Sequence, residues 1–234
     1  MAEYIDISAT DGSGSFKAYV AKPESGEGPV IVALQEIFGV NEGMRQICDD
    51  LARDGYIAIC PDLFWRMEPG VDITDKSKEE WDQAFHYFQN FNHAKGMEDI
   101  AATVEVARTI KGGSGKVGAV GYCLGGLLAF KTSAETDVDA SVCYYGVGLD
   151  SKLDDKDRIT TPLLMHIAEE DGFVDKEAQT RIKDGLADNG NITIHSYPGV
   201  DHAFARPDGV SWNEEAATLA NTRTAAFFKT HLKG

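Results

Sequence analysis

Positive charge is scarce in this sequence of 234 residues. Lys and Arg number 22 against 38 Asp and Glu, which gives a formal net charge of −16 at pH 7. A protein that binds nucleic acid needs a cationic surface to displace the counterions of the phosphates, and no run rich in Lys or Arg supplies one. Anionic membrane surfaces are disfavoured for the same reason. We therefore expect neither nucleic acid nor a membrane as the main partner.

Long apolar runs and clustered metal ligands are also missing. The longest apolar runs, such as residues 29–34, fall far short of the ~20 residues that a transmembrane helix needs. The N-terminal segment contains Glu3 and Asp6 and no apolar stretch, unlike a signal peptide. The four cysteines show neither CxxC nor zinc-like spacing, and the six histidines do not cluster with them. We expect no disulfide, no metal and a reduced, cytoplasmic compartment.

What the sequence does contain is a regular alternation of two patterns. Short apolar or β-branched runs predict strands at residues 29–37, 56–64, 116–123, 140–148, 162–171 and 192–199. Several are apolar nearly throughout, which is typical of parallel strands covered by helices on both faces. Helical patterns lie between and after them, at residues 77–91, at residues 97–110, and after Ser211 toward Leu232. The alternation predicts an α/β fold with a doubly wound, mainly parallel sheet.

Two helix starts and one loop complete this prediction. Ser77 with Glu80 forms a possible capping box before the first helix, and Ser211 with Glu214 a second one before the last helix. The polar stretch 66–78 is expected to be a loop at the edge of the sheet. Because no repeat, low-complexity tract or linker divides the chain, we expect one domain over residues 1–234.

The strongest chemical signal is the segment KVGAVGYCLGGLLAF at residues 116–130. A buried strand ends near Gly121, Cys123 follows at once, and an apolar helix comes next. This pattern is typical of a nucleophile elbow with Cys in place of the commoner Ser, and the flanking Gly121 and Gly125 avoid steric clash at the strained turn. The helix N-terminus favours a thiolate and offers the N–H of Leu124 to an oxyanion. The alternative is a buried structural cysteine.

Carboxylates follow the predicted strand at residues 162–171. In an α/β-hydrolase the acid and then the histidine follow the nucleophile along the chain. Three adjacent carboxylates stand at this place, and the pattern alone does not choose among them: Glu169, Glu170 and Asp171.

The candidate catalytic histidine is His202. It follows the strand predicted at residues 192–199 and lies in a turn rich in Gly and Asp; the alternative is a solvated turn histidine. His166 and His195 lie within predicted strands and are more consistent with packing. One further carboxylate, Glu36, stands at the carboxyl end of an apolar strand. It is either solvated or held in the site, where it could supply a base for the Cys123 thiol or modulate His202.

Several segments together resemble one known family over essentially the whole chain. They are QEIFGVN at 35–41, Met-Arg at 44–45, CPDLF at 60–64, KVGAVGYCLGG at 116–126, YYGVG at 144–148, the acid before Gly172, and HAFAR at 202–206. The family is that of the dienelactone hydrolases, the cysteine branch of the α/β-hydrolases. The resemblance implies a triad of Cys123, Asp171 and His202, and so favours Asp171 among the three carboxylates. It also implies an α/β-hydrolase fold.

The resemblance implies roles for further residues. The oxyanion hole would use the backbone N–H groups of Leu124 and Ile37. Glu36 would contact the resting thiol and help to form the thiolate when substrate arrives. The family's substrates are dienelactones, small unsaturated lactones that carry a carboxylate; 4-carboxymethylenebut-2-en-4-olide is hydrolysed to maleylacetate in the breakdown of chlorinated aromatics.

The sequence departs from the family at the substrate pocket. Of the two arginines that hold the substrate carboxylate, one matches Arg206, but Trp81 stands at the position of the other. Phe85 replaces a tyrosine, and Ala203 replaces the serine after the catalytic histidine. Tryptophan cannot make the bidentate contact of an arginine. A pocket lined by Trp81, Phe85, Phe38 and Phe204 would suit a larger or less charged acyl group, although Trp81 and Phe85 also fit a plain core stripe.

Three functions are therefore compared. The first is hydrolysis of a small lactone or ester of the dienelactone type through Cys123. The second is a carboxylesterase of the same fold that acts on more apolar or neutral esters, and the third is a thiol-based redox or ligand sensor. The acid and histidine in chain order favour hydrolysis. No Walker loop or G-x-G-x-x-G follows a strand, so we expect no cofactor, and we expect a monomer acting on a small molecule.

Overall fold

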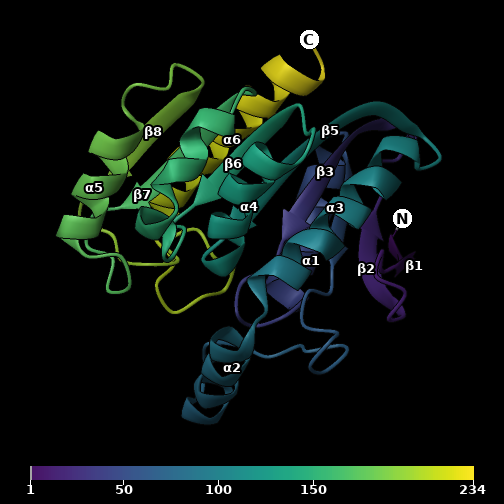
Figure 1. Ribbon diagram of the computed structural model, residues 1–234, viewed down its shortest axis with the longest axis horizontal. Helices are drawn as coiled ribbons and strands as arrows, with labels where there is room; N and C mark the ends of the chain where they lie inside the picture. The colour runs from purple at the N-terminus through teal and green to yellow at the C-terminus, as the bar shows by residue number, and fades with distance from the viewer. Residues whose placement is uncertain (1) are drawn as a thin grey trace. The chain divides into compact units, whose positions relative to one another are not determined.

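The computed structural model (Figure 1) describes residues 2–234 and divides into two compact units, Met1–Gly118 and Ala119–Gly234. Eight strands hydrogen-bond in the order β1-β2-β4-β3-β5-β6-β7-β8, and β5 (Gly113–Tyr122) contains the boundary between the units. The sheet is mainly parallel and alternates with helices, which confirms the predicted α/β fold. One domain over residues 1–234 stays a prediction.

The strands of the first unit include two that the sequence analysis did not predict. β1 and β2 form an antiparallel pair, β2 is antiparallel to β4, and β3 is parallel to β4. The bounds are β1 (Ala2–Ser8), β2 (Ser15–Ala21), β3 (Gly28–Leu34) and β4 (Ile57–Pro61). β3 and β4 are buried almost throughout and match the predicted apolar runs. β1 is mostly exposed and carries charged residues, so it lacks the apolar run by which a buried strand is predicted.

The helices of the first unit are α1 (Glu42–Arg53), α2 (Lys78–Asn90) and α3 (His93–Thr109), of which α1 and α3 pack on the strands. On β2, the hydroxyl of Tyr19 donates to Asp49 of α1 at 2.9 Å. Three positions earlier, Phe16 stacks on Trp65, whose indole N–H donates to Asp99 of α3 at 2.8 Å. Because positions an odd number apart on a strand point to opposite faces, α1 and α3 cover opposite faces.

The start of α2 confirms the first predicted capping box. The Ser77 hydroxyl accepts a hydrogen bond from the N–H of Glu80 at 3.2 Å and donates to the Glu80 carboxylate at 2.9 Å. The helix buries a different face from the expected one, however, because Ala84 and Tyr87 are its buried residues. The predicted apolar face is half-buried: Trp81, Phe85 and Phe88. The preceding stretch is a loop, as predicted.

The second unit places parallel strands between helices. Its elements are β6 (Ala140–Tyr144), β7 (Leu163–Ala168), β8 (Ile192–Tyr197), α4 (Leu124–Glu135), α5 (Lys176–Leu186), α6 (Glu214–Leu232) and the short 3₁₀ helices η1 (Leu149–Ser151) and η2 (Leu153–Arg158). Cys143 of β6 packs with Leu127 and Phe130 of α4, while its neighbour Tyr144 hydrogen-bonds Thr224 of α6. Adjacent strand residues point to opposite faces, so α4 and α6 cover opposite faces of β6.

The predicted start of the last helix is wrong by two residues. The N-cap of α6 is Asn213, whose side chain accepts a hydrogen bond from the N–H of Ala216 at 3.0 Å. Ser211 still belongs to the preceding turn, which is closed by the N–H of Trp212 donating to the Gly209 carbonyl at 3.1 Å. Asn is as good a capping residue as Ser, so composition alone did not separate them.

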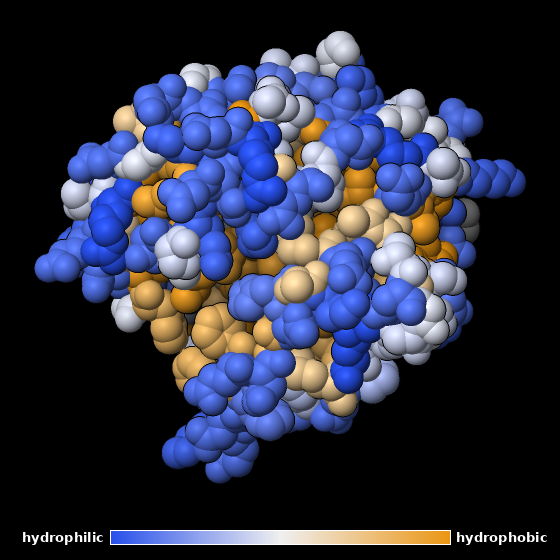
Figure 2. All heavy atoms as spheres, in the orientation of Figure 1, coloured by the Kyte–Doolittle hydropathy of each residue, from blue (hydrophilic) through white to orange (hydrophobic). Residues whose placement is uncertain are grey.

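The surface of the molecule is largely hydrophilic on the face drawn in Figure 2, in keeping with the acidic composition. Over residues 2–234, no helix has both the length and the apolar character that crossing a membrane requires.

Candidate active site

The turn around Cys123 has the geometry of a nucleophile elbow. β5 ends at Tyr122 and α4 begins at Leu124, so Cys123 stands alone between strand and helix with φ 56° and ψ −117°. A side chain with positive φ costs of order 1–3 kcal/mol, which the surrounding fold must offset. A Cβ on Gly121 would lie 1.8 Å from the carbonyl oxygen of Gly125, so only glycine fits there. The predicted strand–turn–helix pattern is confirmed.

Backbone hydrogen bonds hold this turn in place. The N–H of Cys123 donates to the carbonyl of Tyr144 at 3.1 Å, and its own carbonyl accepts from the N–H of Val147 at 3.3 Å. Leu124 is the first residue of α4, and N–H groups in the first turn of a helix have no partner within that helix. Such N–H groups stabilise negative charge, both on a thiolate and on an oxyanion nearby.

Asp171 and His202 come together after two different strands. Nδ1 of His202 lies 2.9 Å from Oδ2 of Asp171, and since a carboxylate only accepts, the imidazole donates. The other carboxylate oxygen of Asp171 accepts from the N–H groups of Phe173 at 2.8 Å and Val174 at 3.1 Å. The carboxylate is therefore held on both oxygens in a buried position. The adjacent Glu170 instead forms an exposed ion pair with Lys176.

The charge state of His202 depends on its surroundings. Burial lowers the pKa of the imidazole, but the negative charge at the Cys123 sulfur and the hydrogen bond to Asp171 outweigh burial and raise the pKa to about 10. Nε2, the ring nitrogen that Asp171 does not use, is buried and makes no hydrogen bond of ordinary geometry within residues 2–234. This arrangement favours the protonated, imidazolium form of His202.

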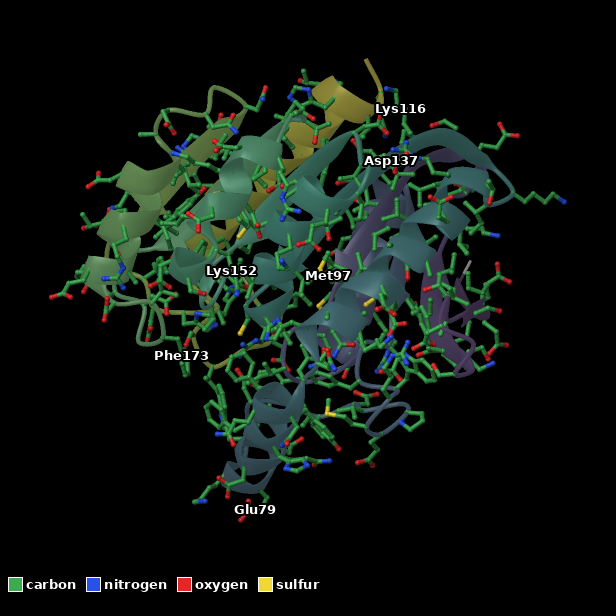
Figure 3. The ribbon with its side chains drawn as sticks, viewed as in Figure 1. Glu79, Met97, Lys116, Asp137, Lys152 and Phe173 are labelled. Carbon is green, nitrogen blue, oxygen red and sulfur yellow. The ribbon has the colours of Figure 1, made fainter. Side chains whose placement is uncertain are left out.

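Two aromatic rings that are not among the predicted site residues lie against His202. Tyr145 meets the imidazole edge-on with ring centres 5.0 Å apart, and Phe173 does so at 4.9 Å. Phe173 lies on the loop after β7 (Figure 3), half exposed, two residues beyond Asp171. Tyr145 has φ 38°, which for a bulky side chain is a strained conformation.

The remaining predicted residues of the second unit follow His202. Ala203 has φ 63° and is buried. Arg206 is 7% exposed, its N–H donates to the Ala203 carbonyl at 3.0 Å, and its aliphatic stem packs so closely on Gly209 that a Cβ there would lie 2.9 Å away. Phe204 is fully buried against the ring of Tyr145 at 5.5 Å. Phe204 is thus a core residue with one edge on the candidate site.

Five of the predicted site residues belong to the first unit. Phe38 meets Trp81 edge-on at 5.1 Å, and Trp81 stacks on Phe85 at 5.4 Å, so the three aromatic side chains form one cluster. Glu36 and Ile37 lie just after β3, separated from it by Gln35, and are buried, each 4% exposed. The alternative of a solvated Glu36 is therefore wrong.

A second buried histidine, His166, lies on β7, as the packing interpretation predicts. Its Nδ1 is 2.8 Å from the hydroxyl of Tyr197, and its Nε2 is 2.9 Å from the hydroxyl of Thr224. Burial, together with the neighbouring charges of His195 on β8 and Arg223 on α6, lowers the pKa of His166 to about 3. The ring is therefore neutral at physiological pH.

We expect this neutral histidine to make the protein less stable in acid. In the unfolded chain the His166 pKa returns to its ordinary value of 6.5, so the unfolded state binds an extra proton between about pH 6.5 and pH 3. Stability is lost as the pH falls through this window, at up to about 1.4 kcal/mol per pH unit. Urea unfolding of the wild type and of His166→Gln between pH 7 and pH 5 measures this, because the variant cannot titrate. Equal slopes in both proteins would contradict the assignment.

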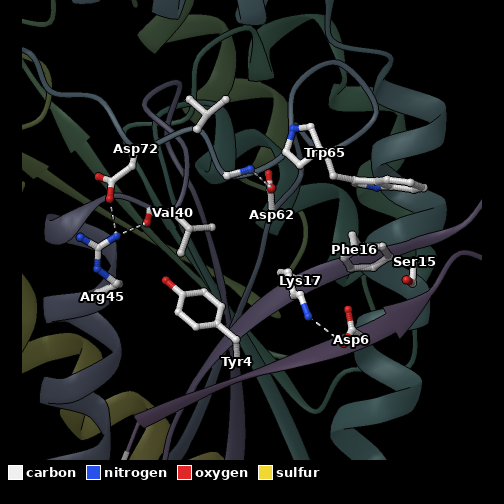
Figure 4. A pocket seen from close by; sticks show the side chains of 13 residues that line it. Tyr4, Asp6, Ser15, Phe16, Lys17, Val40, Arg45, Asp62, Trp65 and Asp72 are labelled. Carbon is white, nitrogen blue, oxygen red and sulfur yellow. Dashed lines mark hydrogen bonds and ion pairs between the residues drawn. The ribbon is translucent and has the colours of Figure 1, made fainter.

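A separate cavity of about 420 Å³ lies in the first unit (Figure 4). Its charged side chains are matched within the protein, since Lys17 pairs with Asp6 and Arg45 pairs with Asp72, each at 2.8 Å. Asp62 accepts two backbone N–H groups there. None of the predicted catalytic side chains lines this cavity, so it is distinct from the candidate active site.

A parallel sheet covered by helices, a strained turn between a strand and a helix, and an acid–histidine pair after later strands define the α/β-hydrolase class. The model of the dienelactone hydrolase family matches residues 16–232. The chain belongs to the dienelactone hydrolase family, and it is a carboxylic ester hydrolase that acts on lactones or esters.

Similar proteins agree with this assignment. A protein of Azospirillum brasilense, provisionally named a carboxymethylenebutenolidase, is 51% identical over 230 residues that cover 97% of this chain and 99% of that protein. The carboxymethylenebutenolidase of Pseudomonas putida is 39% identical over 227 residues, 97% of this chain and 96% of that protein. A crystal structure from Klebsiella pneumoniae, provisionally named a dienelactone hydrolase, has a TM-score of 0.82, 26% identity and coverage of 97% and 98%.

Proposed function

We propose that this protein hydrolyses small lactones of the dienelactone type, converting 4-carboxymethylenebut-2-en-4-olide to maleylacetate, with Cys123 as the nucleophile. One arrangement carries the proposal: Cys123 occupies the strained turn at the N-terminus of α4, and negative charge at its sulfur raises the pKa of His202, whose imidazole donates to Asp171. The carboxymethylenebutenolidase relatives support the substrate class.

The catalytic cycle begins with a thiolate. The Cys123 thiolate attacks the ester carbonyl, and the N–H groups of Leu124 and, by family resemblance, Ile37 stabilise the oxyanion. His202, as imidazolium, gives its proton to the departing alkoxide, which leaves an acyl-enzyme thioester. The neutral imidazole then takes a proton from water, whose hydroxide attacks the thioester and releases the carboxylate product. Asp171 keeps the imidazole oriented throughout.

Glu36 has a different role in this scheme. It is a buried carboxylate next in sequence to the proposed oxyanion donor Ile37. As the family resemblance implies, Glu36 contacts the resting thiol and accepts its proton when a substrate arrives. The reactive thiolate then forms chiefly in the liganded enzyme, which protects Cys123 from oxidation between turnovers.

A carboxylesterase for more apolar esters is the second candidate, and the aromatic cluster favours it. Phe38, Trp81 and Phe85 present three apolar rings where the family has polar groups at two of these positions. The kcat/KM values for the cis and trans dienelactones beside p-nitrophenyl acetate distinguish the two candidates. Efficient dienelactone turnover supports the first, whereas turnover of p-nitrophenyl acetate alone supports the second. Oxidation of Cys123 by peroxide without any ester turnover would support a thiol sensor instead.

Arg206 provides a separate test of substrate charge. We propose that its guanidinium binds the substrate carboxylate, so Arg206→Gln should raise KM for the anionic dienelactones by about 10- to 100-fold, the value of a charged hydrogen bond. The KM for the neutral p-nitrophenyl acetate should change little. Arg181→Gln, which removes an exposed arginine paired with Asp150, is the matched control. Equal losses for neutral and anionic substrates would contradict a carboxylate-binding role.

A further inference from the structure

A continuous chain of hydrogen bonds runs through the second unit on the face covered by α6. The Arg223 guanidinium lies 3.0 Å from the Tyr197 hydroxyl, which lies 2.8 Å from Nδ1 of His166. Nε2 of His166 is 2.9 Å from the Thr224 hydroxyl, and this hydroxyl is 2.7 Å from that of Tyr144. The chain ends where the Tyr144 hydroxyl donates to Asn221 at 2.9 Å. It therefore begins and ends on α6 and joins β6, β7 and β8 in between.

The two ends of this chain determine the direction of every hydrogen bond in it. Arginine only donates, and the side-chain carbonyl of Asn221 only accepts. Since Tyr144 gives its one proton to Asn221, Thr224 must donate to Tyr144 and must accept from Nε2 of His166. A neutral imidazole carries one proton, so Nδ1 accepts from Tyr197. The hydrogen bonds therefore specify the Nε2–H tautomer of His166.

Tyr144 connects this chain to the candidate catalytic residues. Its backbone carbonyl accepts the N–H of Cys123 at 3.1 Å, which is one of the contacts that hold the strained turn. The next residue, Tyr145, packs its ring on His202 and donates its N–H to the His166 carbonyl at 2.8 Å. A shift of β6 relative to β7 would thus move contacts of both the nucleophile and the histidine.

The hydrogen-bonded side chains also lie in the protein interior, where a polar group without a partner lowers stability. Tyr144, His166, Tyr197 and Thr224 are all buried, and α6 runs behind β6 and β7 in Figure 1. Apolar side chains of similar shape would fill this space without needing partners, whereas buried polar groups stabilise only when all of them are satisfied. Unlike apolar packing, these hydrogen bonds permit a single arrangement of α6 against the three strands.

We propose that Tyr144, Thr224 and His166 are positioning residues for hydrolysis, which set the carboxyl end of β6 so that Cys123 and His202 stay aligned for proton transfer. The proposal rests on the proposed role of Cys123 and His202. None of the three side chains touches substrate. They act through the carbonyl of Tyr144 and the ring of Tyr145.

Isosteric removal of one hydroxyl tests the proposal. Thr224→Val keeps the shape of the side chain but removes the hydroxyl in the middle of the series of hydrogen bonds. Tyr144→Phe removes the other hydroxyl of the Tyr144–Thr224 hydrogen bond. A misplacement of reacting groups by a fraction of an ångström should lower kcat for p-nitrophenyl acetate by about 10-fold in both variants, with KM within about twofold of wild type. Thr224→Ser restores the hydroxyl and should restore most of kcat. The control is Thr103→Val, which removes a buried hydroxyl that donates to the Asp99 carbonyl of its own helix at 2.8 Å.

The ¹⁵N NMR signals of His166 give a readout that does not depend on turnover. The wild type should show the Nε2–H tautomer, and Thr224→Val should lose it or mix it with the other form. A folded Thr224→Val protein with the kcat of Thr103→Val, or a wild type with the Nδ1–H tautomer, would overturn the proposal. Failure of the wild type to hydrolyse any ester would instead overturn the proposed function; the rate of Cys123 alkylation by iodoacetamide, which we expect Thr224→Val to lower, then still tests the alignment.

Discussion

Replacement of Cys123 by alanine is expected to lower kcat for lactone and ester hydrolysis by about four orders of magnitude. The alanine side chain has no nucleophilic atom, so no acyl-enzyme can form, and His202 and Asp171 lose the group on which they act. The oxyanion donors remain and should leave a small residual rate. Steady-state kinetics on the dienelactones and on p-nitrophenyl acetate, with the unfolding midpoint recorded for each protein, measure the effect.

Control variants separate the loss of chemistry from the loss of structure. Cys48 is also buried but lies in α1, so Cys48→Ala should keep wild-type kcat within about twofold, with a stability loss of the order expected for a small cavity. Cys123→Ser keeps a nucleophile of much lower acidity and should be intermediate. An unchanged kcat in Cys123→Ala would contradict the proposed mechanism, because hydrolysis would then proceed without the cysteine.

The second large effect is on the free energy of unfolding, and it is expected for replacement of Asp99 in α3. Its carboxylate is 0% exposed and accepts hydrogen bonds from the Nε of Arg66 at 2.9 Å, from the Nη2 of Arg66 at 2.8 Å, and from the indole of Trp65 at 2.8 Å. Asp99→Asn keeps the size of the side chain but turns one acceptor into a donor that faces the guanidinium. We expect the free energy of unfolding to fall by about 3–5 kcal/mol, as when one partner of a buried ion pair is removed. Urea unfolding measures the loss.

An exposed ion pair gives the matched comparison. Asp6 pairs with Lys17 at 2.8 Å, but both side chains are more than half exposed to solvent. Asp6→Asn should therefore cost less than about 1 kcal/mol, since solvent screens the attraction. Similar losses in the two variants would show that burial is not what makes the Asp99 contact strong. Catalytic activity at temperatures where both variants are folded should stay close to wild type.

Much of the fold was predictable because its central strands are buried on both faces. β3, β4, β6 and β7 are mostly apolar and almost entirely buried, and α2 begins at a capping box that the sequence shows directly. β1 was missed because a mostly exposed strand with charged residues resembles a loop in a single sequence, whereas β2 ends in a short apolar run that the prediction overlooked. The start of α6 was placed at Ser211 instead of Asn213, since the turn that delays the helix depends on hydrogen bonds to residues 204 and 209.

The candidate site was predictable to different degrees. Cys123 carries a local signal, because the glycines and the strand–turn–helix pattern surround it in sequence. Asp171 could not be separated from Glu169 and Glu170 by pattern, and only the family resemblance favoured it before the fold placed its carboxylate 2.9 Å from His202. Tyr145 and Phe173, which pack on that imidazole, have no local signal as catalytic neighbours, since aromatic residues are usual in any core.

The sequence by itself determined the class of the fold, the position of the candidate nucleophile and the order of acid and histidine, because hydrophobic periodicity and glycine-dependent turns are local properties. Only the tertiary structure decided which buried polar groups meet. His166, Thr224 and Tyr144 are up to 80 residues apart in the chain, yet their hydrogen bonds have one consistent direction. Such a chain depends on atoms from three strands and one helix reaching hydrogen-bond distance together, and no spacing within a single segment encodes that.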